Sequence, residues 1–163
     1  MSKLVPPHGG KGLVCALLEG KALEDEIKKA EGLKKVEISS RAKGDLIMMG
    51  IGGFSPLDGF MDKANWKSVC EKMLLTDGTF WPVPVTLDIS AEDAAEIKAG
   101  QEIALVRNGM LLATMKVDEI YEMTDEDKKF ECELVFKGQG EDSQKFWDVA
   151  PTDHPGVKMV LAQ

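Results

Sequence analysis

The segment Met48–Met61, MMGIGGFSPLDGFM, is the stretch around which we expect the chain to fold. It contains four glycines and a Ser-Pro step, and glycine is used where the backbone needs a positive φ or where another segment must come close. Pro56 fixes its own φ and favours an extended backbone at Ser55. Apolar side chains that could hold such a loop on a core come from Phe54, Leu57, Phe60 and Met61. The residues alone leave open whether the loop is purely structural or has a more specific role.

An arm, two helices and a strand are predicted before this segment. Residues 1–18 are expected to form an extended N-terminal arm, since prolines and glycines dominate its start. Apolar residues at helical spacing predict a helix over residues 19–32. Residues 36–38 alternate as a short strand does, and Ser39 or Ser40 would then cap a second helix that runs into the segment above.

A third helix is predicted directly after the segment. Asp62 is a candidate N-cap, and one apolar helix face is formed by Trp66, Val69, Cys70 and Met73. Cys70 is therefore predicted to be a buried core thiol rather than a nucleophile.

The next part of the chain reads as a strand followed by a capped helix. Residues 79–89 are rich in β-formers, but Pro82 and Pro84 cannot donate ladder hydrogen bonds, so part of this strand should lie at a sheet edge or a bulge. Ser90 and Asp93 form the capping pattern of the short helix that follows them.

The clearest hairpin of the sequence comes next. Residues 102–107 and 110–121 flank Asn108-Gly109, which is the preferred pair for a type I′ turn. A further capping pair, Thr124 and Asp127, predicts a short helix to about residue 136. Short helices mixed with strands, without a βαβ rhythm, predict an α+β fold or a small open barrel.

Composition bounds the class of protein. The chain has 163 residues, a net charge of −8 and 44% hydrophobic residues, which is typical of one globular domain. The negative charge disfavours nucleic-acid and anionic membrane partners. Three widely spaced cysteines, Cys15, Cys70 and Cys132, fit a reducing compartment better than a disulfide framework. We expect a cytoplasmic protein without a membrane span.

Several motifs, in order, resemble those of one enzyme family. Gly52–Met61, GGFSPLDGFM, resembles the GAFSPLxGFM signature near the start of ATP sulfurylase (sulfate adenylyltransferase). Residues 73–85, MLLTDGTFWPVPV, resemble that family's stretch M-x-L-x-D-G-x-x-W/F-P-x-P-x. Residues 111–121 and the run Asp153–Val157, DHPGV, continue the match. The resemblance covers roughly residues 38–157.

The resemblance implies a fold and a division of the chain. The expected fold class is α+β, a PUA-like β pseudo-barrel with flanking short helices. Residues 19–157 would form this N-terminal domain, and residues 158–163 would begin a linker to a catalytic domain that this chain lacks. The signature residues are implied to be structural: Gly53, Phe54, Ser55, Pro56, Leu57, Gly59, Phe60, Met61, Trp81, Pro82, Pro84, His154, Pro155 and Gly156.

The resemblance also implies the reaction of a parent enzyme, ATP + sulfate → adenosine 5′-phosphosulfate + pyrophosphate. Such an enzyme must hold two anions together with positioned cationic groups, and the family does so with the motifs Q/T-x-R-N-x-x-H-x-x-H and G-R-D-H-A-G. Neither motif is in this sequence. Arg107-Asn108 is a partial match only, because Leu111 stands where the first histidine should be.

The expected ligands and partners follow from that implication. We expect no catalytic residue, cofactor or metal site in this chain, Mg-ATP being the substrate of the parent enzyme. The expected partners are the catalytic domain of the same enzyme and further copies in a homo-oligomer.

A few residues could carry chemistry but have simpler explanations. His154 could contact phosphate or a partner, but a turn histidine at a hinge is preferred. Phe80-Trp81 could stack on adenine, although core or interface packing is preferred, and Arg41 could steer an anion or simply be solvated. Four aspartates could be considered as magnesium ligands: Asp58, Asp62, Asp77 and Asp88. No two of them have the spacing of a paired carboxylate site, and each stands where turns or helix caps favour aspartate. A magnesium site is therefore not expected.

Two other function classes stay open at this point. A free-standing PUA-like RNA-binding module would need a basic, often aromatic surface, which the charge of −8 disfavours. A self-contained small enzyme would have to use Cys70 or His154, but no base or orienting group is suitably spaced around either.

Overall fold

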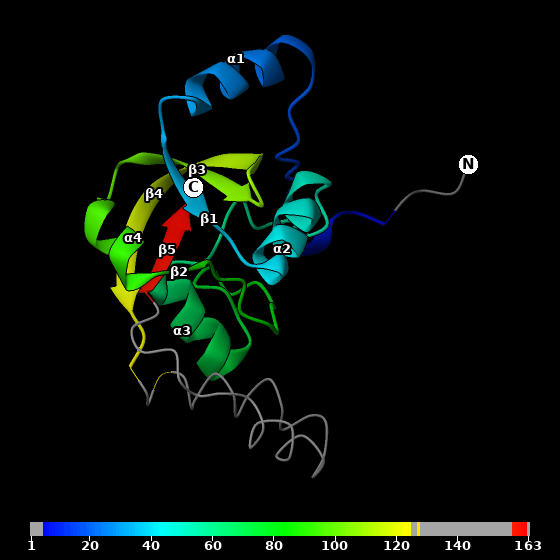
Figure 1. Cartoon of the computed structure of the whole chain (residues 1–163). Coiled ribbons are helices and arrows are strands. Elements are labelled where there is room, and N and C mark those ends of the chain that lie inside the picture. The colour runs from blue at the N-terminus through cyan, green and yellow to red at the C-terminus, as the bar shows by residue number, and fades with distance from the viewer. Residues whose placement is uncertain (1–4, 125–126, 128–157, 163) are drawn as a thin grey trace.

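The computed structural model describes residues 5–124, residue 127 and the backbone course of residues 158–162 (Figure 1). Its elements, in chain order, are a 3₁₀ turn η1 (His8–Gly10), α1 (Gly20–Ala30), β1 (Lys34–Glu37), α2 (Ser40–Gly50), α3 (Lys63–Lys72), β2 (Asp88–Ile89), α4 (Ala91–Glu96), β3 (Glu102–Arg107), β4 (Met110–Glu122) and β5 (Lys158–Ala162).

The strands form one mixed sheet in the order β1-β3-β4-β5-β2. β1 runs parallel to β3, whereas β3 with β4, β4 with β5, and β5 with β2 are antiparallel. β1 and β2 lie at the two edges, so the sheet is open. The predicted α+β class with short flanking helices is confirmed.

The helix starts follow the capping residues of the sequence. The side chain of Ser39 accepts a hydrogen bond from the Ala42 amide at 3.1 Å, and Asp62 accepts one from Asn65 at 2.6 Å. The Ser90 hydroxyl accepts a hydrogen bond from the Asp93 amide at 3.0 Å and caps α4. Each cap satisfies an amide that the first turn of a helix would leave without a partner. Asp62 and Ser90 were predicted as caps, and Ser39 was one of the two candidates for α2.

The core lies between the sheet and the helices beneath it. Trp66, Val69 and Cys70 of α3 are each no more than 2% exposed, which confirms Cys70 as a core thiol. They pack in one cluster with residues in or next to β1, β2, β3 and β4, among them Val36, Leu87, Ile103, Leu105 and Val117. The same cluster includes Phe60 and Met61 of the run Gly52–Met61, which we call the signature segment or signature loop.

The hairpin turn is as predicted. Asn108 and Gly109 have φ values of 50° and 77°, the positive angles that a type I′ turn needs at both central positions. Arg107 donates a hydrogen bond from Nη1 to the Ile38 carbonyl at 2.6 Å, and the Asn108 amide donates to Glu37 Oε1 at 2.7 Å. Arg107-Asn108 is thus engaged in closing the hairpin on the end of β1.

Two predictions about the middle of the chain are wrong. Residues 79–89 are not one strand, because only Asp88–Ile89 forms β2 and Phe80 makes an isolated bridge to Leu74. The two prolines between these points remove the amides that a continuous ladder needs. Met73 does not extend the apolar face of α3, since it has left-handed backbone angles that end the helix and its side chain is 39% exposed.

The chain end also differs from expectation. Residues 158–163 were expected to begin a linker, but Lys158–Ala162 is the strand β5, which pairs with both β4 and β2. The apolar run was visible in the sequence, but its pairing partners are distant in the chain.

The Thr124–Asp127 capping pair is confirmed by hydrogen bonds in both directions. The helix expected after it lies outside the described residues, as do His154, Pro155 and Gly156.

Helix α1 stands apart from the rest of the molecule (Figure 1). Ala30 is its only buried residue. Glu26 accepts a hydrogen bond from the Thr114 hydroxyl at 2.6 Å, and Lys29 bridges Glu26 and Glu102 at 2.7 and 2.8 Å. These contacts lower the pKa of Glu26 and raise that of Lys29. Polar contacts at one flank therefore tie α1 to the sheet.

Candidate functional site

The signature segment folds as a tight loop at the C-terminal end of α2. The amides of Ile51, Gly52 and Gly53 donate to carbonyls of the last turn of α2, with a Gly53–Met48 distance of 2.7 Å. Gly52 has φ +78°, and a Cβ added there would lie 2.8 Å from Cys15 Sγ. Both the backbone angle and the close approach of the arm therefore require glycine at this position.

Ser55 is the polar centre of this loop. It is 6% exposed, and the peptide bond that joins it to Pro56 is cis. Its hydroxyl donates to the Gly52 carbonyl at 2.7 Å and accepts from the Val14 amide at 2.9 Å. One buried hydroxyl thus closes the loop on itself and attaches the N-terminal arm to it.

The second half of the segment anchors the loop in the core. The Met61 amide donates to the Val85 carbonyl at 2.8 Å, and Phe60 and Met61 are buried. Phe54 packs edge-on against Trp81, with ring centroids 5.9 Å apart and an interplanar angle of 87°. The signature segment is therefore fixed at its polar centre and at its apolar end.

The N-terminal arm lies over this loop, a contact that no local sequence pattern predicts. The His8 ring nitrogen Nε2 is hydrogen-bonded to the Phe80 carbonyl, and its ring lies 6.3 Å from that of Trp81. Gly9 has φ +77°, and a Cβ added there would lie only 3.1 Å from the Pro56 side chain. We define the arm clamp as His8, Lys11, Val14, Ser55 and Asp77.

An exposed ion pair completes the arm clamp. Lys11 Nζ lies 3.0 Å from Asp77 Oδ2, and Asp77 also accepts a hydrogen bond from the Thr79 amide at 3.0 Å. The Thr79 bond, supported by Lys11, lowers the pKa of Asp77 to about 2. Lys11 belongs to the glycine-rich stretch His8–Gly12, and its ammonium is held by this carboxylate.

Two of the four aspartates considered for magnesium are engaged in other contacts. Asp62 caps α3, and Asp77 holds Thr79 and Lys11. Across residues 5–124 and 127, no three His, Cys, Asp or Glu side chains come together as metal ligands would. Within the same part of the chain no helix has the length and apolar character needed to cross a membrane.

Phe80 and Trp81 have different surroundings. Phe80 is 54% exposed, whereas Trp81 is packed between His8 and Phe54. The indole Nε1 of Trp81 is buried without a hydrogen-bond partner among the described residues. Trp81 is therefore part of the packing around the loop, whereas the Phe80 ring is open to solvent.

Arg41 lies near Asp45, a half-buried carboxyl that sequence reasoning missed. Burial raises the pKa of Asp45, and the nearby Arg41 guanidinium opposes that rise. Asp45 Oδ2 has no hydrogen-bond partner within the described part of the chain. Nothing in the sequence distinguishes this aspartate from the solvated charges around it, because its burial depends on the packing of the α2 helix.

The structure combines a tight glycine- and proline-containing loop, an N-terminal arm held against it and an open mixed sheet. The sequence matches the family described as PUA-like domain over residues 5–163. The chain belongs to the PUA-like domain family.

Longer relatives are called sulfate adenylyltransferase. The relative from Desulfovibrio desulfuricans is 82% identical over 163 residues, which are 100% of this chain and 38% of the relative. The relative from Desulfatibacillum aliphaticivorans is 67% identical, and the match covers 100% of this chain and 39% of the relative. The chain thus spans less than two fifths of the length of these curated relatives.

A solved structure has the same fold. The hexameric APS kinase from Thiobacillus denitrificans matches with a TM-score of 0.66 and 30% sequence identity, over 76% of this chain and 24% of that chain.

Proposed function

We propose that this chain is the N-terminal scaffold domain of a sulfate adenylyltransferase. The parent enzyme would form adenosine 5′-phosphosulfate and pyrophosphate from ATP and sulfate, by attack of a sulfate oxygen on the α-phosphorus of ATP. The observation that carries the proposal is the 82% identity to a sulfate adenylyltransferase of which the chain covers 38%. Sulfate activation in the cytoplasm would be the setting.

The chemistry of the parent enzyme would lie outside this chain. The sequence lacks the arginine- and histidine-containing motifs that the family uses on its anionic substrates. The ammonium of Lys11, on the arm that lies over the signature loop, is already paired with Asp77. Mg-ATP would accordingly bind to the catalytic domain, with this chain contributing no cofactor or metal ligand.

The role of the chain would be to hold other parts of the enzyme in place. The buried Ser55 hydroxyl and the arm clamp order a loop that has no catalytic group of its own. Oligomerisation of the parent enzyme is supported by the hexameric state in which the structurally similar kinase is described. The partners would be the catalytic domain of the same polypeptide and further copies of it.

A chimera with the Desulfovibrio desulfuricans relative tests the scaffold role. This chain would replace the 38% of the relative that it matches, and the remaining part would also be produced alone. We expect pyrophosphate release from ATP and molybdate by the chimera, and much less by the remaining part alone. Equal turnover per catalytic domain, with and without this chain, would contradict a scaffold role.

A free-standing RNA-binding module is not favoured. The relatives that cover this whole chain are enzymes by name, and the net charge of −8 opposes binding to phosphates.

A further inference from the structure

A group of exposed apolar side chains adjoins the signature loop on the side of α1. We call it the apolar shoulder, formed by Leu13, Leu17, Leu23, Ile27, Ile47 and Ile51. Leu13, Leu17 and Ile51 are 66%, 64% and 61% exposed. The run Gly12–Leu18 contains no charged residue, yet only its Val14 is half-buried. Exposure of so many neighbouring apolar side chains is typical of an interaction surface.

The parts of the apolar shoulder are held together by the backbone. The Ala16 amide donates to the Met49 carbonyl at 3.3 Å, and the Leu17 amide donates to the Gly50 carbonyl at 3.2 Å. The arm is therefore attached to the C-terminal end of α2, next to Ile51. The same arm continues directly into α1 at Gly20, so one continuous stretch of backbone links the end of α2 to α1.

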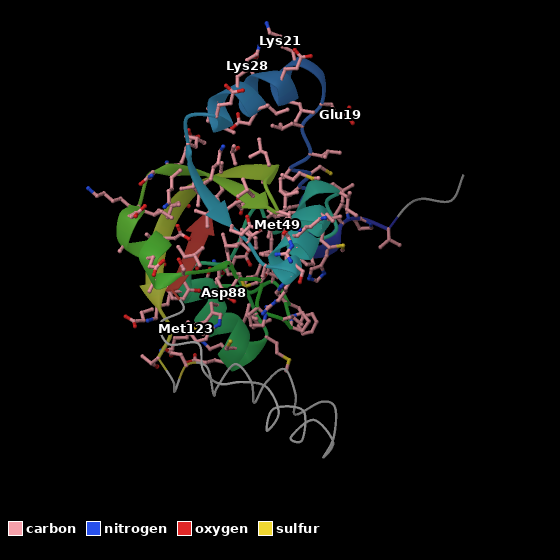
Figure 2. All side chains as sticks on the ribbon, viewed as in Figure 1. Glu19, Lys21, Lys28, Met49, Asp88 and Met123 are labelled. Atoms are coloured by element: carbon pink, nitrogen blue, oxygen red, sulfur yellow. The ribbon has the colours of Figure 1, made fainter. Side chains whose placement is uncertain are left out.

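Helix α1 presents an apolar flank that its own domain does not cover. Figure 2 shows Lys21 and Lys28 pointing away from the sheet. On the opposite side, Ala30 is buried, whereas Leu23 and Ile27, which share its stripe, are 43% and 45% exposed. An amphipathic helix gains most of its stability by burying this stripe. In α1 the stripe is only partly used, which leaves contact area for a partner.

The position of the chain end indicates which partner is close. Ala162 of β5 pairs with Val117, and Val117 exchanges backbone hydrogen bonds with Gly100 and Gln101. The next residue, Glu102, binds Lys29 of α1 at 2.8 Å. β5 therefore ends at the same end of the sheet to which α1 is tied. The relatives are more than twice as long as the matched part, since it covers 38% of one of them.

We propose that the apolar shoulder is the surface on which the remaining part of the parent polypeptide packs, through an apolar face of its own. This inference rests on the proposed function, because it needs a longer polypeptide. A polypeptide that continues from β5 emerges beside α1 and reaches the apolar shoulder without crossing the sheet. The contact would cover the α1 stripe and the uncharged arm together.

Hydrogen exchange measured on this chain and on the chimera with the Desulfovibrio desulfuricans relative tests the inference. In the chimera, exchange should slow about tenfold or more in peptides covering residues 12–27, relative to this chain alone. Leu17→Lys with Ile51→Lys should abolish that slowing and leave the unfolding midpoint of the chain alone unchanged. The matched controls are Val83→Lys and Met110→Lys, whose side chains are 50% and 63% exposed outside the apolar shoulder. They should retain the slowing.

The outcomes separate this inference from the proposed function. An active chimera in which residues 12–27 exchange as fast as in the chain alone would overturn the docking surface and leave the proposed function intact. Concentration-dependent protection in the chain alone, with a dimer seen by light scattering, would assign the apolar shoulder to a second copy and overturn the inference. A chimera without pyrophosphate release would overturn the proposed function and, with it, the inference.

Discussion

The Ser55 hydroxyl accepts a hydrogen bond from the Val14 amide at 2.9 Å, across 41 positions of the sequence. The same oxygen donates to the Gly52 carbonyl at 2.7 Å. The loop and the N-terminal arm therefore share one side chain that is 6% exposed. Removal of this hydroxyl should affect both segments at once.

Ser55→Ala should lower the free energy of unfolding by about 1–3 kcal/mol, because the Val14 amide would lose its partner in a half-buried place. Urea denaturation measures the change, and amide exchange at Val14 should accelerate. Ser40→Ala is the matched control, since Ser40 is exposed and Ser39 is the cap of that helix. Equal stability of the two variants would refute the importance of this bond.

Two glycines should respond to alanine in opposite directions. Gly52→Ala should destabilise the chain by about 1–3 kcal/mol, because the backbone has φ +78° and the new Cβ would meet Cys15 Sγ at 2.8 Å. Gly44→Ala, inside α2 with open space around it, should stabilise it by about 0.5–1 kcal/mol. Thermal unfolding of both variants shows whether each substitution raises or lowers the stability of the chain. Stabilisation by Gly52→Ala would contradict the described loop.

Attachment of the arm by Asp77 should depend on pH. The pKa of Asp77 is lowered from 3.8 to about 2 in the folded chain, so its contribution is complete above about pH 4 and is lost as the pH falls towards 2. Asp77→Asn should lack this dependence. NMR titration of the Lys11 and Thr79 amides checks it. A wild-type midpoint near the ordinary value would show that neither the Thr79 bond nor the Lys11 pair holds Asp77 in solution. High salt should weaken the Lys11–Asp77 pair.

RNA binding should be absent at low salt. Non-specific complexes owe their affinity to neutralised phosphates, with dissociation constants of about 10⁻⁴–10⁻⁶ M, and the net charge of −8 opposes them. A gel shift with a structured RNA hairpin in low salt checks this expectation, with a basic RNA-binding domain as the positive control. A shift by this chain at micromolar concentration would revive the RNA-binding alternative.

Local rules predicted much of the fold. Asp62 and Ser90 were identified as caps because each stands directly before its helix, and Ser39 was one of two candidates for α2. Asn108-Gly109 was identified because its turn needs two positive φ values. Such signals act over a few residues. They place elements along the chain but do not say which distant elements meet.

The contacts around the candidate site depend on distant parts of the chain and could not be predicted in the same way. The Lys11–Asp77 pair and the Ser55–Val14 bond span 66 and 41 positions, and no local pattern marks either partner. The strand expected over residues 79–89 failed because local β propensity was outweighed by two prolines. The exposure of the apolar flank of α1 could not be predicted either, because periodicity shows that a helix is amphipathic but not what covers its apolar side.

The central claim is that the catalytic chemistry lies outside this chain. The most direct measurement is ATP cleavage to AMP and pyrophosphate with molybdate in place of sulfate, because the molybdate adduct hydrolyses and the unfavourable equilibrium does not mask turnover. At equal molar concentrations, we predict no pyrophosphate above the blank from this chain and clear release from the chimera. Molybdate-dependent release by the chain alone would place the catalytic groups within its 163 residues and contradict the claim.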